Sequence, residues 1–281
     1  MKKFKYKKAS SLEEASALLK SENNSKVIAG GTDILVQIKD RVKLPEVLVD
    51  LSYIESLKTI KEEGEYIEIG SLATHSRIAT EAVVLNHAKV LAMASLSIGS
   101  PQIRNRGTIG GNIMNASPAG DMIPALFVLD AELVYFTGTE FKAIPIINFF
   151  EGPGRTKLQS TDILTSVKFK KHSGWHGYFH KIASRNALAI SKLSFAGMMK
   201  VKENVITNAR FAYGAVGPKV IKGNILEKEV IGKNKKELDL KAIEEAVKKE
   251  ITPISDLRST AEYRKEITAI ITRRIFESSK P

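Results

Sequence analysis

Residues 106–124, with the sequence RGTIGGNIMNASPAGDMIP, bring two glycines, an amide and a carboxylate close together. Gly110 and Gly111 have no Cβ, so a ligand can lie directly against their peptide N–H groups. Thr108 and Asn112 add polar side chains on either side of the glycines. The stretch has neither the Lys-Ser/Thr of a P-loop nor the spacing of a Rossmann fingerprint, so it indicates a different kind of glycine loop.

Asp121 supplies the carboxylate of this stretch. The preceding Ser117-Pro118 fixes the direction of the chain, because proline locks its own φ and biases the residue before it towards an extended conformation. Asp121 is followed by helix-forming residues, so it could cap a helix or accept hydrogen bonds from ribose hydroxyls or an adenine amine. Taken alone, the loop is equally compatible with an ordinary helix start.

A second glycine pair occurs in AGGTD, Ala29 to Asp33, directly after a predicted strand. Successive N–H groups in such a turn form a concavity that binds anions such as phosphate, and Thr32 adds a hydroxyl donor. The Asp33 carboxylate would repel a phosphate unless it points away or caps the following helix. A single turn of this kind is most often just a turn. Two such loops, each expected at the end of a strand, favour one long ligand with a diphosphate lying between two subdomains.

The helices and strands that the sequence predicts around these loops indicate an α+β chain and not a doubly wound parallel sheet. A capping box, Ser10 with Glu13, predicts the first helix, and Ser259 with Glu262 predicts the last. Between them we expect a helix capped near Thr74 and a hairpin around Glu203-Asn204. The remaining predicted elements are a hairpin turning at EEGE, a helix in HAKVLAMASLSIG, and strands at KVI, PEVLVDLS, AELVYF, FKAIPI, DILTSVKF and GYFHKIAS. A break in composition at FKKHSGWHG marks a domain boundary.

Composition limits the function classes. The 281 residues include no cysteine, which excludes disulfides, thiolate metal sites and a cysteine nucleophile within the chain. The basic start MKKFKYKKAS has no apolar region behind it and no segment is long and apolar enough to span a bilayer, so a cytoplasmic protein is expected. The net charge of +12 is spread along the chain and diluted by Glu and Asp. It therefore favours a solvated surface together with docking to an acidic partner over nucleic-acid binding.

Three histidines, His172, His176 and His180, are spaced four apart, as metal ligands on a helix would be. The glycines and aromatic residues between them disfavour a helix, and no carboxylate or thiolate completes a coordination shell. No metal site is expected. His75 is interpreted as an ordinary residue at the start of a helix, and GPGRTK, residues 152–157, as a surface turn.

Three segments in order, IAGGTDILVQIKDR, GSPQIRNRGTIGGNIMNASPAGDMIPAL and DLRSTAEYRKEITAIITRR, resemble the FAD-binding medium subunit of the molybdenum hydroxylases. That group includes xanthine, carbon monoxide and nicotinate dehydrogenases, and the resemblance covers essentially the whole chain. It implies an FAD-binding domain of the vanillyl-alcohol-oxidase (PCMH) type made of two α/β subdomains, residues 1–55 and 56–172. A smaller C-terminal α+β domain, residues 173–281, is expected to follow.

The resemblance also implies which residues bind FAD. The loop that wraps the pyrophosphate and reaches the flavin corresponds to Val27, Ile28, Ala29, Gly30, Gly31, Thr32, Asp33 and Ile34. The loop at the phosphates and the flavin edge corresponds to Thr108, Gly110, Gly111 and Asn112. The other matches are Asp121 at the adenosine ribose, Ile98 near the adenine, and Leu164 and Lys181 on later strands.

The implied function is that of an electron-transfer subunit in a multi-subunit molybdenum hydroxylase. Its partners would be a molybdenum–pterin large subunit and a [2Fe-2S] small subunit, and electrons would pass from the clusters through FAD to NAD or another acceptor. No nucleophile–base pair or acid–base dyad is recognisable, so the expected site residues are binders and none is catalytic. No residue is placed for covalent attachment, so FAD is expected to be dissociable. The alternatives are a stand-alone flavin oxidase of the same fold and a nucleotide- or nucleic-acid-binding protein without flavin.

The chain departs from the pattern of eukaryotic xanthine dehydrogenases at Asn186-Ala187-Leu188-Ala189, where those enzymes carry acidic residues near the flavin. This departure leaves the electron acceptor open. The hydroxybenzoyl-CoA reductase branch, which holds an extra cluster through cysteines, is excluded because the chain has none.

Overall fold

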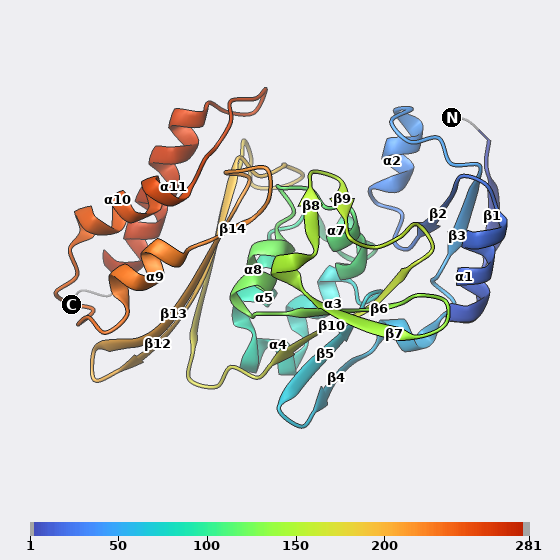
Figure 1. The fold of residues 1–281 in the computed structure, drawn as a ribbon. Coiled ribbons are helices and arrows are strands. Elements are labelled where there is room, and N and C mark those ends of the chain that lie inside the picture. The colour runs from blue at the N-terminus through green and yellow to red at the C-terminus, as the bar shows by residue number, and fades with distance from the viewer. Residues whose placement is uncertain (1–2, 278–281) are drawn as a thin grey trace.

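Three larger sheets and one two-stranded sheet are present in a computed structural model that describes residues 3–277 (Figure 1). The first sheet is parallel, in the order β1 (Lys5–Lys8), β3 (Val47–Asp50), β2 (Ser25–Ile28). Its connections carry α1 (Leu12–Ser21) and α2 (Ile34–Lys39). Because the strands are parallel, their carboxyl ends share one edge, and the first glycine turn begins at that edge, directly after β2.

The second sheet is antiparallel, in the order β4 (Ile60–Glu63), β5 (Tyr66–Gly70), β10 (Ile163–Lys170), β6 (Glu132–Phe136), β7 (Phe141–Pro145). Between β5 and β6 the chain forms α3 (His75–Thr80), α4 (Ala82–His87), α5 (Lys89–Leu96), α6 (Pro101–Arg104), α7 (Ile109–Met114) and α8 (Met122–Val128). Shorter elements are the 3-10 helices η1 (Glu55–Lys58) and η2 (Ile146–Asn148) and the hairpin of β8 (Phe150–Gly152) with β9 (Arg155–Thr156). This helix cluster carries the second glycine pair.

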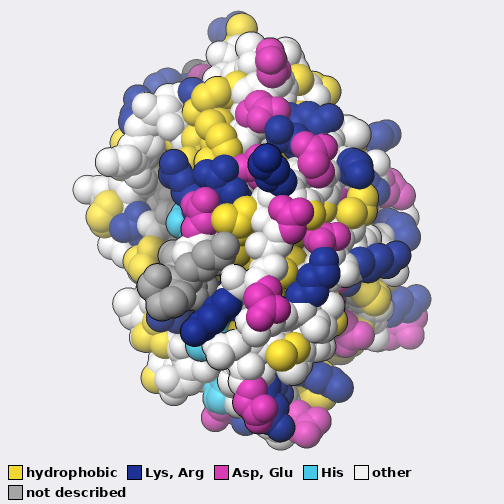
Figure 2. All heavy atoms as spheres, turned by 90° about the vertical axis from the view of Figure 1, so that its left-hand side faces the viewer, with side chains coloured by type: hydrophobic (Ala, Val, Ile, Leu, Met, Phe, Trp, Pro, Cys, Tyr) yellow, Lys and Arg dark blue, Asp and Glu magenta, His cyan; other side chains and the backbone are white. Residues whose placement is uncertain are grey.

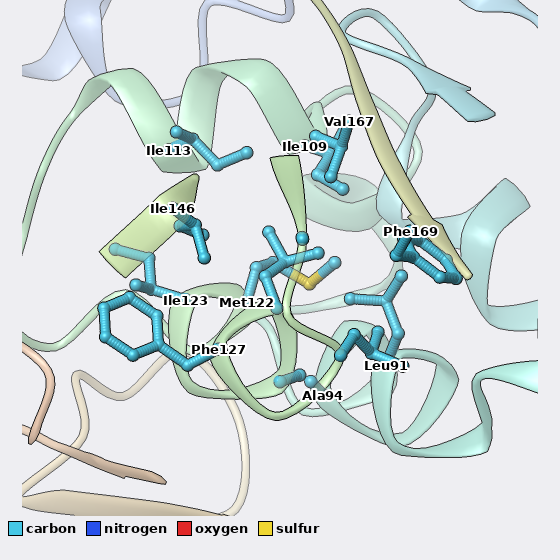
Figure 3. Close-up of a cluster of buried hydrophobic side chains, with 14 of the residues drawn as sticks. Leu91, Ala94, Ile109, Ile113, Met122, Ile123, Phe127, Ile146, Val167 and Phe169 are labelled. Carbon is cyan, nitrogen blue, oxygen red and sulfur yellow. The ribbon is translucent and has the colours of Figure 1, made fainter. Parts of the chain in front are cut away.

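The main hydrophobic core lies between these helices and the second sheet (Figure 3). Met122 and Phe127 of α8 are buried together with Leu91 of α5, while Val167 and Phe169 project from β10. Every residue of α8 is buried. A short helix that is apolar all round is stable only in such a core, and the core therefore fixes the position of Asp121, which precedes α8.

The third sheet, in the order β11 (His176–Ile182), β12 (Leu193–Lys202), β13 (Val205–Gly214), β14 (Ile221–Lys222), is antiparallel and shared between two cores. Alternate side chains of a strand point to opposite faces. Ala196 and Met198 accordingly belong to the main core, whereas Phe195 and Phe211 belong to a separate core. That second core packs against α9 (Asn224–Val230), α10 (Leu240–Glu250) and α11 (Ala261–Glu277).

Most of the expected local elements are present. The EEGE hairpin is β4–β5, the helix predicted in HAKVLAMASLSIG is α5, and GPGRTK forms the turn of the β8–β9 hairpin. Glu203 and Asn204 turn the β12–β13 hairpin with positive φ values of 50° and 65°. Thr74 caps α3 by accepting from the backbone N–H of Arg77.

Both predicted capping boxes are displaced by one residue. The N-cap of α1 is Ser11, which accepts from the N–H of Glu14, and not Ser10. Ahead of α11, the hydroxyl of Thr260 accepts from the N–H of Tyr263, while Ser259 belongs to the preceding turn. Adjacent serines and threonines are chemically equivalent caps, so the local sequence does not distinguish them.

Over residues 3–277, none of the helices combines the length and apolar character that crossing a bilayer requires.

Candidate cofactor site

The two glycine turns are in direct contact. A Cβ on Gly30 would overlap the carbonyl oxygen of Arg106 and lie 3.1 Å from the backbone nitrogen of Gly107. A Cβ on Gly107 would lie 3.3 Å from the hydroxyl oxygen of Thr32. Gly31 completes the first turn with a φ of +75°, which favours glycine. The turns therefore form one site, as expected for loops that hold one ligand.

The sequence predicted that the second glycine pair follows a strand, but in the structure it does not. Gly110 and Gly111 form the first turn of α7, and Thr108 is its N-cap, accepting from the N–H of Gly111 at 3.1 Å. Thr108 also pairs with Thr74 in an isolated β-bridge. This long-range pairing replaces the expected strand, and it cannot be seen in a local window of sequence.

The two glycines of this pair have different roles. The N–H of Gly110 donates to the carbonyl of Ser71 at 2.8 Å, and a Cβ on Gly110 would lie 2.7 Å from that oxygen. Gly110 is therefore required by packing. A Cβ on Gly111 would meet only the hydroxyl of Thr108, at 3.1 Å. Packing against the rest of the chain therefore does not explain why position 111 has no side chain.

Asp33 is turned away from the first glycine turn. It stands at the N-cap position of α2 without capping it, and its carboxylate instead accepts from the side-chain amide of Gln37. The same amide donates to Oδ1 of Asn115, the C-cap of α7, at 3.2 Å. The Asp33 carboxylate is thus held by its own helix, α2, and the shared Gln37 amide links the helices that follow the two turns.

Three buried polar atoms near the second turn have no hydrogen-bond partner among the described residues. One is Nδ1 of His75, a residue that is 3% exposed and whose Cδ2 would lie 3.1 Å from a Cβ on Gly107. The others are Oδ1 of Asn112 and Oγ of Ser71, the residue that packs against Gly110. Burial, reinforced by the positive charge of Arg104, lowers the pKa of His75 to about 4, so the imidazole is neutral at physiological pH. Unpaired buried polar groups are costly, and a bound ligand can supply the missing partners.

A buried network lies at the start of α8. Nζ of Lys181 donates to Oδ2 of Asp121 at 2.6 Å and to the carbonyl of Ser97 at 3.1 Å. The hydroxyl of Ser191 donates to Oδ1 of Asp121 at 2.5 Å. Burial raises the pKa of Asp121, while the Lys181 ammonium and the Ser191 hydroxyl oppose that shift. The predicted site residues Asp121 and Lys181 are thus in direct contact.

A cleft of about 580 Å³ opens beside this network. It lies between the C-terminal part of α5, strand β11 and the segment 183–189, and Ser97, Lys181 and Arg185 contribute polar groups to it. Its apolar lining includes Met93 and Phe179. A concave site with a few convergent polar groups on an apolar wall is typical of small-molecule binding.

Of the apolar site residues expected from the sequence, Ile28 and Leu164 are buried in the cores and the others are partly buried against them. Val27 and Ala29 pack on one face of the first sheet, and Ile28 and Ile34 belong to the small core on its other face. Leu164 lies in the main core and Ile98 packs against it. The four residues of the first loop can therefore contribute to a ligand site mainly through their backbone.

Sequence reasoning missed several residues of the site. Gly107 and Arg106 make the contact between the turns, Ser71 packs against Gly110, and Ser97 and Ser191 complete the network around Asp121. Gly107 was visible as a third glycine in the quoted stretch. The serines gave no signal, because their partners lie far away in the sequence.

The three spaced histidines do not form a site. His176 and His180 lie on the predicted strand, β11, while the ring of His172 packs edge-on against Trp175. In the described part of the chain, no cluster of three His, Asp or Glu residues could hold a metal ion. On the face that carries α9, α10 and α11, Lys and Arg side chains are interspersed with Asp and Glu (Figure 2). Ion pairs such as Lys248–Glu266 and Arg273–Glu244 account for part of this pattern.

Two protein-family descriptions match the chain in succession. "FAD binding domain in molybdopterin dehydrogenase" matches residues 2–169, and "CO dehydrogenase flavoprotein C-terminal domain" matches residues 178–279. The first match spans both glycine turns and Asp121, and the second spans Lys181 and Ser191.

Curated relatives match over nearly their full length. The glyceraldehyde dehydrogenase medium chain of Sulfolobus acidocaldarius is 31% identical over 274 residues, which cover 98% of this chain and 97% of that protein. The nicotinate dehydrogenase FAD-subunit of Eubacterium barkeri is also 31% identical, covering 98% and 96%. Among solved structures, a chain of carbon monoxide dehydrogenase from Hydrogenophaga pseudoflava superposes with a TM-score of 0.92 at 26% identity, covering 97% of this chain and 96% of that chain.

The structure itself fits FAD. A long dinucleotide can use several of its features. The two glycine turns are in contact, Gly111 has room for a ligand, buried polar atoms lack partners, and the Asp121 carboxylate bonds to a residue that lines a cleft. The chain therefore belongs to the FAD-binding proteins of the molybdopterin dehydrogenase family, which are oxidoreductase subunits with FAD as cofactor.

Proposed function

We propose that the chain is the electron-transfer subunit of a multi-subunit molybdenum hydroxylase, passing electrons from [2Fe-2S] clusters of a partner subunit through FAD to NAD or another acceptor. The observation that carries the proposal is the contact between the turn at Gly30 and the turn at Gly107 in a member of this family. That contact brings the backbones of the two turns together, so that one ligand could lie against both.

The residues of the two turns would hold the diphosphate and the flavin end. The N–H groups of Gly30 and Gly31 with the hydroxyl of Thr32 form the anion-binding part, and Gly111 leaves room for close approach. Neutral His75 would border this part of the site, where its N–H can donate without adding a charge. Asp121 and Lys181 would receive the adenosine end, because a carboxylate is the ordinary acceptor for ribose hydroxyls.

When bound, FAD supplies one- and two-electron chemistry, and the protein's contribution is binding, orientation and electrostatics. The network around Asp121 fixes one end of the site, and the main core fixes the turns at the other. All the site residues named above are binding residues in this proposal, and a dissociable cofactor is expected.

The partners follow from the family. Glyceraldehyde dehydrogenase and carbon monoxide dehydrogenase are relatives whose matching chains are named medium chains, so those enzymes have further subunits. We propose that this chain likewise assembles with a molybdenum–pterin large subunit and a [2Fe-2S] small subunit. The matching relatives carry subunit names, which does not favour a stand-alone oxidase.

Two measurements test the proposal. The purified chain is mixed with FAD, freed of unbound flavin by gel filtration and examined for visible flavin absorption, and acid precipitation should then release the flavin. Affinity purification from the native organism, followed by metal analysis, should recover molybdenum and iron with the chain. A chain that binds no FAD, or one that turns over a substrate by itself with no co-purifying metal, would contradict the proposal.

A further inference from the structure

We propose that Ser191 is a positioning residue of the cofactor site, whose hydroxyl holds the Asp121 carboxylate in the orientation that receives the adenosine end of FAD. The inference rests on the proposed function and adds to it a residue for which the sequence gave no role. Ser191 does not touch the cofactor in this proposal and acts through Asp121.

The geometry around Asp121 fixes the plane of its carboxylate. Ser191 is 1% exposed, and its hydroxyl donates to Oδ1 at 2.5 Å. Nζ of Lys181 donates to the other oxygen, Oδ2, at 2.6 Å. A carboxylate offers about four lone-pair positions on its two oxygens, so one donor on each oxygen leaves a further position on each. Two neighbouring hydroxyl groups, as on a ribose, match that remaining capacity.

The orientation of Asp121 is not the one that an ordinary helix start requires. Asp121 precedes α8 at the N-cap position, yet its side chain makes no capping hydrogen bond. The carboxylate is turned instead towards Lys181 and Ser191. Lys181 and Ser97 line the cleft beside α5, so the buried carboxylate bonds directly to a residue in the wall of a space that a ligand can enter.

Ser191 belongs to a segment that is anchored at two points. The segment joins β11 to β12, and the N–H of Leu188 donates to the carbonyl of Gly99 at 3.0 Å. Ser191 forms the second anchor, on Asp121. Without its hydroxyl, Asp121 would retain Lys181 on one oxygen only and could rotate about the bond to its Cβ.

The test is a fluorescence titration of the full chain with FAD. Ser191→Ala should raise the Kd for FAD about tenfold, which corresponds to the loss of one hydrogen bond to a charged group. The absorption spectrum of the flavin at saturating FAD should be unchanged, because the flavin end lies at the glycine turns. Ser194→Ala is the matched control, since Ser194 is 0% exposed on β12 and its hydroxyl has no partner in the described structure.

A double-mutant cycle decides whether Ser191 acts through Asp121. In an Asp121→Ala background, Ser191→Ala should produce no further loss of affinity. An unchanged Kd in Ser191→Ala would overturn the inference. So would an equal loss in both backgrounds, or an altered flavin spectrum together with a lowered thermal midpoint, which indicate a general structural role. A wild-type chain that binds no FAD would instead contradict the proposed function itself.

Discussion

His75 is a residue whose burial makes stability depend on pH. Its pKa is about 4 in the folded chain, against an ordinary value of 6.5, because burial and the nearby Arg104 disfavour the charged form. Between these values the unfolded state binds more protons, so the stabilisation is complete above pH 6.5 and is lost as the pH falls towards 4. The shift corresponds to roughly 3 kcal/mol.

Urea unfolding at a series of pH values from 7.5 to 4 measures this effect. His75→Leu should flatten the loss of stability across that window relative to the wild type. His176→Leu is the matched control, because it makes the same substitution at a histidine that is exposed on β11. Parallel pH profiles for the wild type and His75→Leu would show that the imidazole is not held neutral.

Gly30 and Gly111 should respond differently to the same added methyl group. In Gly30→Ala the new Cβ would overlap the carbonyl of Arg106, so the two turns must separate. We expect a loss of 1–3 kcal/mol in stability, the range for an overpacked site, together with weaker FAD binding. In Gly111→Ala the Cβ meets only the Thr108 hydroxyl, so stability should change by less than about 0.5 kcal/mol while FAD binding weakens.

Thermal unfolding and FAD titration of both variants separate these effects. If Gly111→Ala binds FAD as the wild type does, no ligand approaches its backbone and that part of the site assignment is wrong. If Gly30→Ala keeps full stability, the contact between the turns is not required for folding.

At the scale of the element, α1 follows two adjacent serines, and the sequence alone does not show which of them caps the helix. Ser11 caps α1, and the Glu14 carboxylate accepts from the backbone N–H and the hydroxyl of Ser10 at 2.8 and 2.6 Å. Ser11→Ala should therefore cost about 1 kcal/mol in unfolding free energy, the typical value for an N-cap. Ser10→Ala should cost less, since Glu14 keeps its bond to the backbone. The reverse order in chemical denaturation would restore the cap predicted from the sequence.

The elements that the sequence predicted correctly are those specified by local signals. The β4–β5 turn needs Gly64 at a φ of +58°, and Thr74 caps α3 within four residues of sequence. The start of α7 was missed because it depends on the bridge between Thr74 and Thr108 and on the bond from Gly110 to Ser71, which are tertiary contacts.

The residues of the candidate site likewise divide into those that local sequence signals identify and those that depend on tertiary contacts. The turn after β2 and Asp121 could be singled out from the local sequence, and the resemblance to a known family supplied Lys181. The pairing of those two residues, and the presence of Ser191 beside them, require the third sheet to pack on α8. Nothing in a local pattern specifies that packing. The FAD-binding role of the individual residues remains a prediction, as do the limits of the three units at residues 55 and 172.

At the scale of the whole molecule, the third sheet joins the C-terminal helices to the cofactor-binding part. One face of the sheet belongs to the main core and the other to the core under α9–α11. Removing either part would expose an apolar face of the same sheet to water. We therefore expect the chain to unfold as one cooperative unit, although it has more than one core.

Arg210 joins the third sheet to the end of α8, a contact that we call the junction. Removing it should make the unfolding of the chain less cooperative. From β13, it donates to the carbonyl of Val128 at 3.2 Å and pairs with Asp130 at 3.1 Å, and its guanidinium lies 5.0 Å from the centre of the Trp175 ring. Val128 is the last residue of α8, where a positive charge also complements the helix dipole. Arg210→Met should lower the unfolding free energy by about 2 kcal/mol, the value of hydrogen bonds from a charged donor.

The chain's single tryptophan, Trp175, reports on this junction. In the wild type, the fluorescence and far-UV circular dichroism transitions in urea should coincide. In Arg210→Met the fluorescence transition should move to lower urea than the circular dichroism transition, because the junction opens before the sheets unfold. Lys222→Met is the matched control, since Lys222 approaches the same Asp130 at 3.7 Å and, in the described structure, does not bond to the end of α8. If both variants keep coincident transitions at the wild-type midpoint, then the shared sheet alone couples the two parts of the molecule and Arg210 adds nothing to that coupling.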